Sequence, residues 1–287
     1  MTRALFVAVA GQPGRLVDPE APVLHADDRG AMLGDGVFET VEVRDGDAPL
    51  WPEHEARLRA AAAALRLPVP WSGAELRAAV RAVATAAAAA RAVARVVVTR
   101  GRGPRGYAPP AVARPTLLVQ VFAAPPAPPP WRLAVLDAPR TDPAALAWTH
   151  KTLAAAERVR AVDIARRRGA HEGLLLGPRA AVACTTAANL FWIRGATLYT
   201  PHPRCGLRPG VARGLVLRLA PELGLRAREG RYALAALDEA DEVFATNALV
   251  HVQPVVEVLG RRRWSPGPWT RALGDAYDQA VRTVASG

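Results

Sequence analysis

Lys151 stands out because it is the single lysine of the chain. Lysine and arginine together number 37 in 287 residues, so one lysine leaves 36 arginines. Arginine supplies charge and phosphate contacts as well as lysine does, but its guanidinium neither loses its proton near neutral pH nor condenses with an aldehyde. A lysine kept among so many arginines therefore indicates amine chemistry, as a nucleophile or a base. The alternative is the chance survival of one surface lysine under this composition.

The residues around Lys151 predict that it lies in the first turn of a helix. The apolar spacing indicates a helix over 149–168, with Thr149 as N-cap and Gly169 as its stop. The positive end of the helix dipole disfavours an ammonium group there. We therefore expect this position to favour the uncharged amine of Lys151.

The remaining periodicity predicts helices and strands that do not alternate regularly. Apolar runs predict strands over 5–10, 37–43, 95–99, 116–122, 131–136, 173–176, 181–184, 190–193, 197–200, 242–245 and 252–259. Helical spacing predicts helices over 52–65, 72–91 and 209–223, and one that begins at Pro268. This mixture favours an α+β fold in two lobes over a doubly wound sheet.

A proline-rich stretch divides the chain. Residues 123–130, AAPPAPPP, can form neither a helix interior nor a central strand. We interpret them as a linker between a small N-terminal α+β domain (1–122) and a larger C-terminal domain (131–287) that carries Lys151.

Composition disfavours several classes of protein. The formal charge is +11, but the arginines are scattered and have no interleaved aromatic stripe, so we expect no nucleic-acid partner. No apolar run approaches the ~20 residues of a membrane span, and the short run over 4–10 fits a buried strand better than a signal peptide. Cys184 and Cys205 make neither a disulfide framework nor a zinc pattern. We expect a cytoplasmic protein without a metal site.

Seven stretches occur in an order that is typical of one enzyme family. They are HADDRGAMLGDGVFETVEVRDG (25–46), H-x-x-R-L (54–58), TRGRGPRGYAPP (99–110), HKTL (150–153), AANLFW (187–192), LRPGVAR (207–213) and ADEVFATNALVHVQPV (240–255). The set resembles fold-type IV pyridoxal-phosphate enzymes, namely branched-chain aminotransferases, D-amino-acid aminotransferases and, most of all, 4-amino-4-deoxychorismate lyases. The resemblance implies the two-domain architecture of D-amino-acid aminotransferases and a homodimer.

The resemblance also implies roles for individual residues. Lys151 matches the lysine that bonds to pyridoxal 5'-phosphate and then moves protons. Arg57 matches the arginine that binds the cofactor phosphate. Val211 and Ala212 match a turn whose backbone amides hold that phosphate at a helix N-terminus, and Thr246 matches a hydroxyl that also reaches it.

Three further residues fall in stretches that line the substrate side in the family. They are Phe38, Arg105 and Tyr107. The substrate is therefore expected to be a small molecule.

Cys184 departs from the family pattern, because it occupies the position of a glutamate that keeps the pyridine nitrogen protonated. A thiol offers only a weak hydrogen bond there. We therefore expect a poorer electron sink and poor transamination.

These residues leave four functions to distinguish. The leading one is elimination of pyruvate from 4-amino-4-deoxychorismate or a related acid, which gives the 4-aminobenzoate of folate biosynthesis and is driven by aromatisation. The second is a descendant that no longer uses pyridoxal phosphate and employs Lys151 or Cys184 for other chemistry. The third is a D-amino-acid or branched-chain transaminase, and the fourth is a binding protein on a decayed scaffold.

Overall fold

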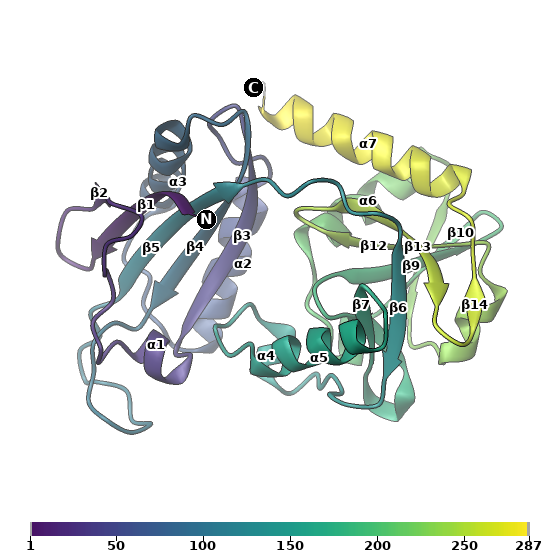
Figure 1. The fold of residues 1–287 in the computed structure, drawn as a ribbon, viewed down its shortest axis with the longest axis horizontal. Coiled ribbons are helices and arrows are strands. Elements are labelled where there is room, and N and C mark those ends of the chain that lie inside the picture. Colours follow the sequence, from purple (N-terminus) through teal and green to yellow (C-terminus); the bar gives the residue numbers. More distant parts are fainter. Residues whose placement is uncertain (1, 286–287) are drawn as a thin grey trace. The chain divides into compact units, whose positions relative to one another are not determined.

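A computed structural model describes residues 2–285 and divides the chain into two compact units (Figure 1). The first unit contains the residues up to Pro125, the segment His150–Ala154 and the end of the chain from Arg282. The second contains Pro126–Thr149 and Ala155–Val281. The boundary at Pro125 falls inside the proline-rich stretch, but the Lys151 segment groups with the first unit, unlike in the division drawn from the sequence.

Within the described residues, the first unit holds a five-stranded antiparallel sheet in the order β2-β1-β5-β4-β3. The strands are β1 (Thr2–Val9), β2 (Arg15–Val17), β3 (Gly36–Arg44), β4 (Arg91–Thr99) and β5 (Thr116–Ala123). Successive side chains of a strand point to opposite faces, so Phe38 and Glu39 of β3 face opposite sides of this sheet.

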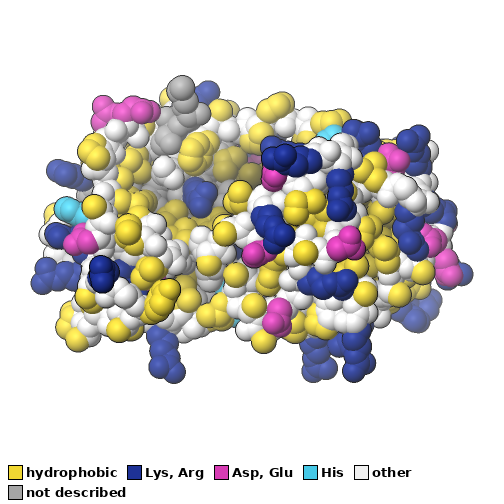
Figure 2. Space-filling model, turned by 60° about the horizontal axis from the view of Figure 1, so that its bottom comes forward, with side chains coloured by type: hydrophobic (Ala, Val, Ile, Leu, Met, Phe, Trp, Pro, Cys, Tyr) yellow, Lys and Arg dark blue, Asp and Glu magenta, His cyan; other side chains and the backbone are white. Residues whose placement is uncertain are grey.

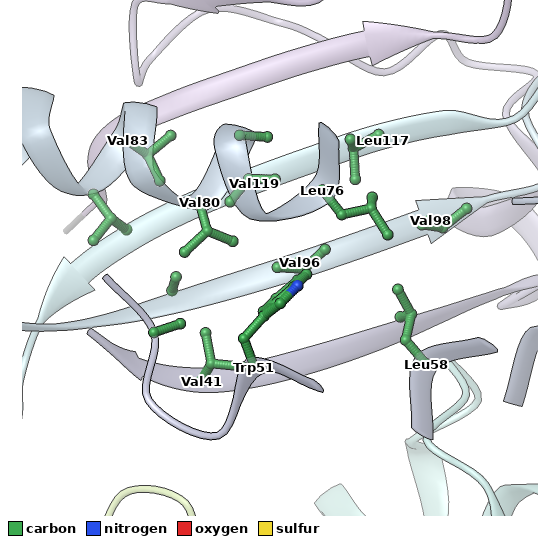
Figure 3. Packing of buried hydrophobic residues seen from close by; sticks show 14 of the residues in the cluster. Val41, Trp51, Leu58, Leu76, Val80, Val83, Val96, Val98, Leu117 and Val119 are labelled. Carbon is green, nitrogen blue, oxygen red and sulfur yellow. The ribbon is translucent and has the colours of Figure 1, made fainter. Parts of the chain in front are cut away.

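Helices α2 (Trp51–Ala64) and α3 (Gly73–Ala87) bury one face of the sheet. A capping box between Ser72 and Glu75 starts α3, since each side chain satisfies a backbone N–H of the other residue. Figure 3 shows the apolar side chains of α3 and the Trp51 ring packed against those of the strands. The labelled residues are Val41, Trp51, Leu58, Leu76, Val80, Val83, Val96, Val98, Leu117 and Val119.

The second unit contains a nine-stranded sheet, counted over the part of the chain that the structure describes. Its strands are β6 (Trp131–Leu136), β7 (Glu172–Leu176), β8 (Val182–Thr185), β9 (Asn189–Arg194), β10 (Thr197–Pro201), β11 (Arg226–Gly230), β12 (Glu242–Asn247), β13 (His251–Val258) and β14 (Arg262–Arg263). Because β8 pairs with both β7 and β9, the strands β9-β12-β13-β6-β7-β8 form a closed ring.

The two faces of this ring carry separate apolar clusters. One cluster includes Leu174, Leu190 and Ala245. The other includes Leu175 and Cys184, together with Ala161 of the helix α5 (Ala156–Arg167). Neighbours along a strand, such as Leu174 and Leu175, thus belong to different clusters, as strand alternation requires.

The remaining helices differ in length, from single turns to the 18 residues of α7. They are α1 (Arg29–Leu33), α4 (Leu146–Thr149), α6 (Val211–Glu222), α7 (Pro268–Ala285) and the 3-10 helices η1 (Pro178–Ala180), η2 (Pro203–Cys205) and η3 (Leu234–Glu239). The mixture of helices and strands confirms the predicted α+β class. Among the described helices, none combines the length and apolar character that a membrane crossing requires.

The prediction that Lys151 opens a helix is wrong. Helix α5 begins at Ala156, and Thr149 instead ends α4, where its hydroxyl donates to the carbonyl of Ala145 at 3.1 Å. The intervening residues pair with β3, since the Phe38 N–H donates to the Lys151 carbonyl and the Leu153 N–H to the Gly36 carbonyl, each at 2.9 Å. Tertiary strand pairing overrides the local helical preference, so the helix-dipole argument does not apply to Lys151.

Candidate functional site

In the first unit, the amine of Lys151 lies over the aromatic ring of Phe38. The Nζ atom is 4.0 Å from the ring centroid, and the guanidinium of Arg95 lies 4.4 Å from the same centroid. The strand beside the lysine segment has no room for a side chain at Gly36, because a Cβ there would lie 2.7 Å from the Val98 carbonyl oxygen and 2.7 Å from Leu153 Cδ1. Strand pairing and a cation–π contact thus position the half-buried amine.

Arg57 is oriented by a buried carboxylate on the opposite face of the sheet. Its Nε and Nη2 donate to the two oxygens of Glu39 at 2.7 and 2.6 Å, and His54 Nδ1 lies 3.0 Å from Glu39 Oε2. Burial by itself would raise the pKa of Glu39, but the charge and hydrogen bonds of Arg57 and the bond to His54 lower it to about 2. Burial also lowers the pKa of His54. Neither bond from Arg57 to Glu39 uses Nη1, so that group can face an anion.

Arg29 holds the backbone of the loop that carries Arg105 and Tyr107. The guanidinium is buried and donates to the carbonyls of Gly106 at 2.9 Å and Tyr107 at 3.0 Å, while its Nε donates to Asp35 at 2.9 Å. The side chain of Tyr107 is 89% exposed and that of Arg105 is also exposed. The structure therefore does not pack these two side chains against Phe38.

In the second unit, three residues named or implied by the sequence form a row across neighbouring strands. Cys184 of β8 is the register partner of Asn189 of β9, which is in turn the partner of Thr246 of β12. Register partners place their side chains on the same face of a sheet. The three side chains therefore share one face of the ring.

Asn189 connects this row to the N-terminus of α6. Its Oδ1 accepts from the Gly210 N–H at 3.1 Å, and its Nδ2 donates to the Arg208 carbonyl at 2.9 Å. No side chain caps the helix and no acidic residue occupies its first turn, which starts with Val211 and Ala212. The amides at such a helix start, with the positive end of the dipole, suit a phosphate.

Thr246 supplies an independent indication of a ligand. Thr246 is 1% exposed, and its Oγ1 atom is buried without a hydrogen-bond partner among the described residues. A buried hydroxyl without a partner is unfavourable by about 1–3 kcal/mol, so this atom calls for an acceptor such as a phosphate oxygen. The α6 start and Thr246 thus fit the phosphate end of pyridoxal phosphate.

Cys184 is buried and has an arginine beside its thiol. Burial raises the pKa of Cys184, while Arg158 and Arg208 oppose that rise. Arg158, which the sequence analysis missed, also hydrogen-bonds to the sulfur. No sequence signal singled it out among the arginines, because its partners Trp148, Cys184 and Thr186 come together only in the folded chain.

Metal ligation and surface charge add little to the site. Over residues 2–285, no group of three His, Cys, Asp or Glu side chains is placed to hold a metal ion. Figure 2 shows lysine and arginine side chains spread among acidic and apolar ones over the displayed face.

Comparisons with known proteins identify the family of the chain. The family model for amino-transferase class IV matches residues 36–258. The D-alanine aminotransferase of Listeria monocytogenes is 28% identical over 249 residues, 85% of this chain and 86% of the relative. The aminodeoxychorismate lyase of Bacillus subtilis is 28% identical over 278 residues, 94% of each chain. A hypothetical aminotransferase from Mycobacterium tuberculosis, solved in a PLP-bound form, has a TM-score of 0.84 at 26% identity and covers 97% of this chain and 99% of its own.

Proposed function

The chain belongs to the amino-transferase class IV family, and from that premise we propose that it is an aminodeoxychorismate lyase-like enzyme. It would use pyridoxal phosphate to eliminate pyruvate from 4-amino-4-deoxychorismate, or a related amino-cyclohexadiene acid, and release 4-aminobenzoate. The observation that carries this choice over transamination is Cys184, a buried thiol beside an arginine where the family places a carboxylate.

The residues available for the cofactor are those that the family resemblance marks. In the first unit they are the Lys151 amine and the Arg57 guanidinium, which Glu39 already orients. In the second they are the amides of Val211 and Ala212 and the hydroxyl of Thr246, which has no other partner among the described residues. When bound, pyridoxal phosphate supplies an electron-withdrawing ring conjugated to the substrate nitrogen.

Lys151 is the proton carrier in this proposal. Its amine takes the proton from the substrate carbon that bears the amino group and returns a proton to the departing enolpyruvyl oxygen. One C–H bond and one C–O bond break, the six-membered ring becomes aromatic, and enolpyruvate tautomerises to pyruvate. Phe38, beneath Nζ at 4.0 Å from its ring centroid, holds the amine in place.

Aromatisation makes this reaction less demanding of the cofactor than transamination is. Transamination requires that negative charge be stored on the ring, which a carboxylate-stabilised pyridinium does best. A thiol beside a guanidinium does not stabilise a pyridinium. The similarity to a D-alanine aminotransferase keeps transamination as the second candidate.

The first test is covalent binding of the cofactor. We expect the native protein to develop visible absorbance with pyridoxal phosphate, and borohydride reduction to fix the cofactor on the peptide that contains Lys151. Lys151→Ala should stay colourless, and so should Lys151→Arg, which keeps the charge but cannot condense with an aldehyde. A native protein that stays colourless and gains no mass contradicts the proposal and favours a descendant that works without the cofactor.

Product analysis separates the two activities. With aminodeoxychorismate, the native protein should form pyruvate and 4-aminobenzoate in equal amounts. With D-alanine or a branched-chain amino acid, it should form little keto acid and little pyridoxamine phosphate. The reverse pattern would establish a transaminase.

A further inference from the structure

The Arg158 guanidinium in the second unit lies beside Cys184, and its hydrogen bonds to the described residues go to backbone carbonyls and to the thiol rather than to a carboxylate. Arg158 Nη1 donates to the Thr186 carbonyl at 2.8 Å and Nη2 to the Trp148 carbonyl at 3.3 Å. The guanidinium carbon stacks 4.7 Å from the centroid of the Trp148 ring. The Nε atom is buried and has no hydrogen-bond partner among the described residues. Arg158 is therefore held rigidly in place while one of its donors stays unused.

Thr186 adds a second unused donor on the same side. Its residue is 2% exposed, and its Oγ1 is buried without a partner in the described part of the chain. It follows the end of β8, and its methyl group lies on the side of β7 toward which a Gly173 side chain would point, the face that Leu175 and Cys184 share. Gly173 leaves room beside it, because a Cβ there would lie 3.2 Å from the Thr186 methyl carbon.

The nearby carboxyl group belongs to the other face of the sheet. Glu172 alternates with Gly173 and Leu174 along β7, so it shares the face of Leu174 and not that of Leu175 and Cys184. The Glu172 carboxyl group accepts hydrogen bonds from the Thr185 side chain and from the Ala187 backbone. Arg158 and Arg208 both act on the Cys184 thiol as positive charges.

The register gives the distance between this cluster and the phosphate end of the site. Cys184, Asn189 and Thr246 occupy three adjacent strands. Adjacent strands are about 4.8 Å apart, so Cys184 and Thr246 are separated by about 10 Å. A phosphorylated pyridine with its phosphate at Thr246 and the α6 N-terminus can therefore extend its ring toward Cys184.

We propose that Arg158, Cys184 and Thr186 form a subsite, with a guanidinium and without a carboxylate, that takes the cofactor's ring nitrogen as an unprotonated hydrogen-bond acceptor. This inference rests on one part of the proposed function, the binding of pyridoxal phosphate, and it does not require the lyase reaction. A guanidinium, a hydroxyl and a thiol can each donate a hydrogen bond to a neutral nitrogen. A protonated pyridinium would instead lie beside the positive charge of a guanidinium without a carboxylate to balance it, which disfavours protonation of the ring nitrogen.

The test observes the ring nitrogen itself. The full-length protein is loaded with pyridoxal phosphate labelled with 15N in the ring, and the 15N chemical shift reports whether that nitrogen is protonated. We expect the unprotonated shift in the native protein from mildly acidic to mildly alkaline pH. Cys184→Glu, which supplies a carboxylate, should move the signal to the protonated position and raise pyridoxamine phosphate formation.

Arg158→Leu tests the guanidinium, and Arg160→Leu is the matched control because Arg160 is exposed on the same helix. In a titration, the native protein should bind the N1-methylated cationic analogue about 10-fold to 100-fold more weakly than pyridoxal phosphate. Arg158→Leu should reduce this difference in affinity between pyridoxal phosphate and the methylated analogue, and Arg160→Leu should leave it unchanged. Circular dichroism of both variants checks that they fold.

The outcomes separate this inference from the proposed function. A protein that binds no pyridoxal phosphate contradicts both. A protein that binds it with a protonated ring nitrogen, or that binds the methylated analogue equally well, overturns the subsite proposed for the ring nitrogen and leaves the lyase proposal standing.

Discussion

Two carboxyl groups, one in each unit, lie near arginines, and yet their pKa values are shifted in opposite directions. Glu39 in the first unit has its pKa lowered from 4.5 to about 2, whereas Glu172 in the second has its pKa raised from 4.5 to about 7. Burial favours the neutral acid in both cases. The difference is direct contact, because Arg57 donates two hydrogen bonds to Glu39 while Glu172 is bonded by Thr185 and the Ala187 backbone.

This comparison shows how the fold positions two arginine guanidinium groups, those of Arg57 and Arg158, by different means. Glu39 neutralises and orients Arg57 through Nε and Nη2, and neither of these bonds uses the Nη1 group, which can face an anion. Arg158 is oriented by backbone carbonyls and a tryptophan face, which fix its position without neutralising its charge.

Breaking the Glu39 contact should have the largest effect on stability. Glu39→Ala leaves Arg57 and the buried His54 without their acceptor, and we expect a loss of about 3 kcal/mol in the free energy of unfolding. Urea denaturation at neutral pH measures it. Glu39→Gln keeps the shape and part of the hydrogen bonding, so its loss should be smaller. A loss below about 1 kcal/mol for Glu39→Ala would contradict the assigned contact.

Lowering the pH should remove the contribution of ionised Glu39 to the free energy of unfolding without any mutation. A lowered pKa means that the unfolded state binds the proton more readily, so the contribution of Glu39 is complete above pH 4.5 and is lost as the pH falls toward 2. The shift corresponds to about 3 kcal/mol. Since other carboxylates titrate in this range, the informative quantity is the native stability minus that of Glu39→Gln. A difference that stays constant with pH would refute the assignment.

The contribution of Glu172 to the free energy of unfolding should change less with pH than that of Glu39, and in the opposite direction. Its raised pKa means that the folded state binds the proton more readily, so its contribution to stability falls as the pH rises from 4.5 through 7. Allowing for its partial exposure, we expect Glu172→Gln to be more stable than the native protein by on the order of 1 kcal/mol above pH 8 and equal to it near pH 4. Thermal unfolding at both pH values checks this. Equal stability at high pH would show that the Glu172 carboxylate is well solvated.

Local sequence was sufficient where a pattern and its partner lie close together along the chain. The alternation over 37–43 located β3, and the spacing over 209–223 located α6 together with the helix start that suits a phosphate. The Ser72 and Glu75 capping box likewise marks the start of α3 from adjacent residues. These features depend on backbone geometry that a few residues determine.

Long-range pairing decided what the sequence could not. The helix expected from Thr149 begins at Ala156, because His150–Ala154 pairs with β3 instead. The partnership of Glu39 with Arg57 joins a strand to a helix, and that of Arg158 with Thr186 joins a helix to a turn. Such contacts appear only once the chain has folded.

The sequence alone singled out Lys151, matched the chain to its family and revealed that Cys184 departs from the family pattern, because residue identity and order carry that information. Only the tertiary structure showed that the lysine lies on a strand-like segment over Phe38 and that Arg158 donates toward Cys184. The physical reason is that hydrogen bonds and cation–π contacts depend on distances of a few ångströms between residues far apart in the chain.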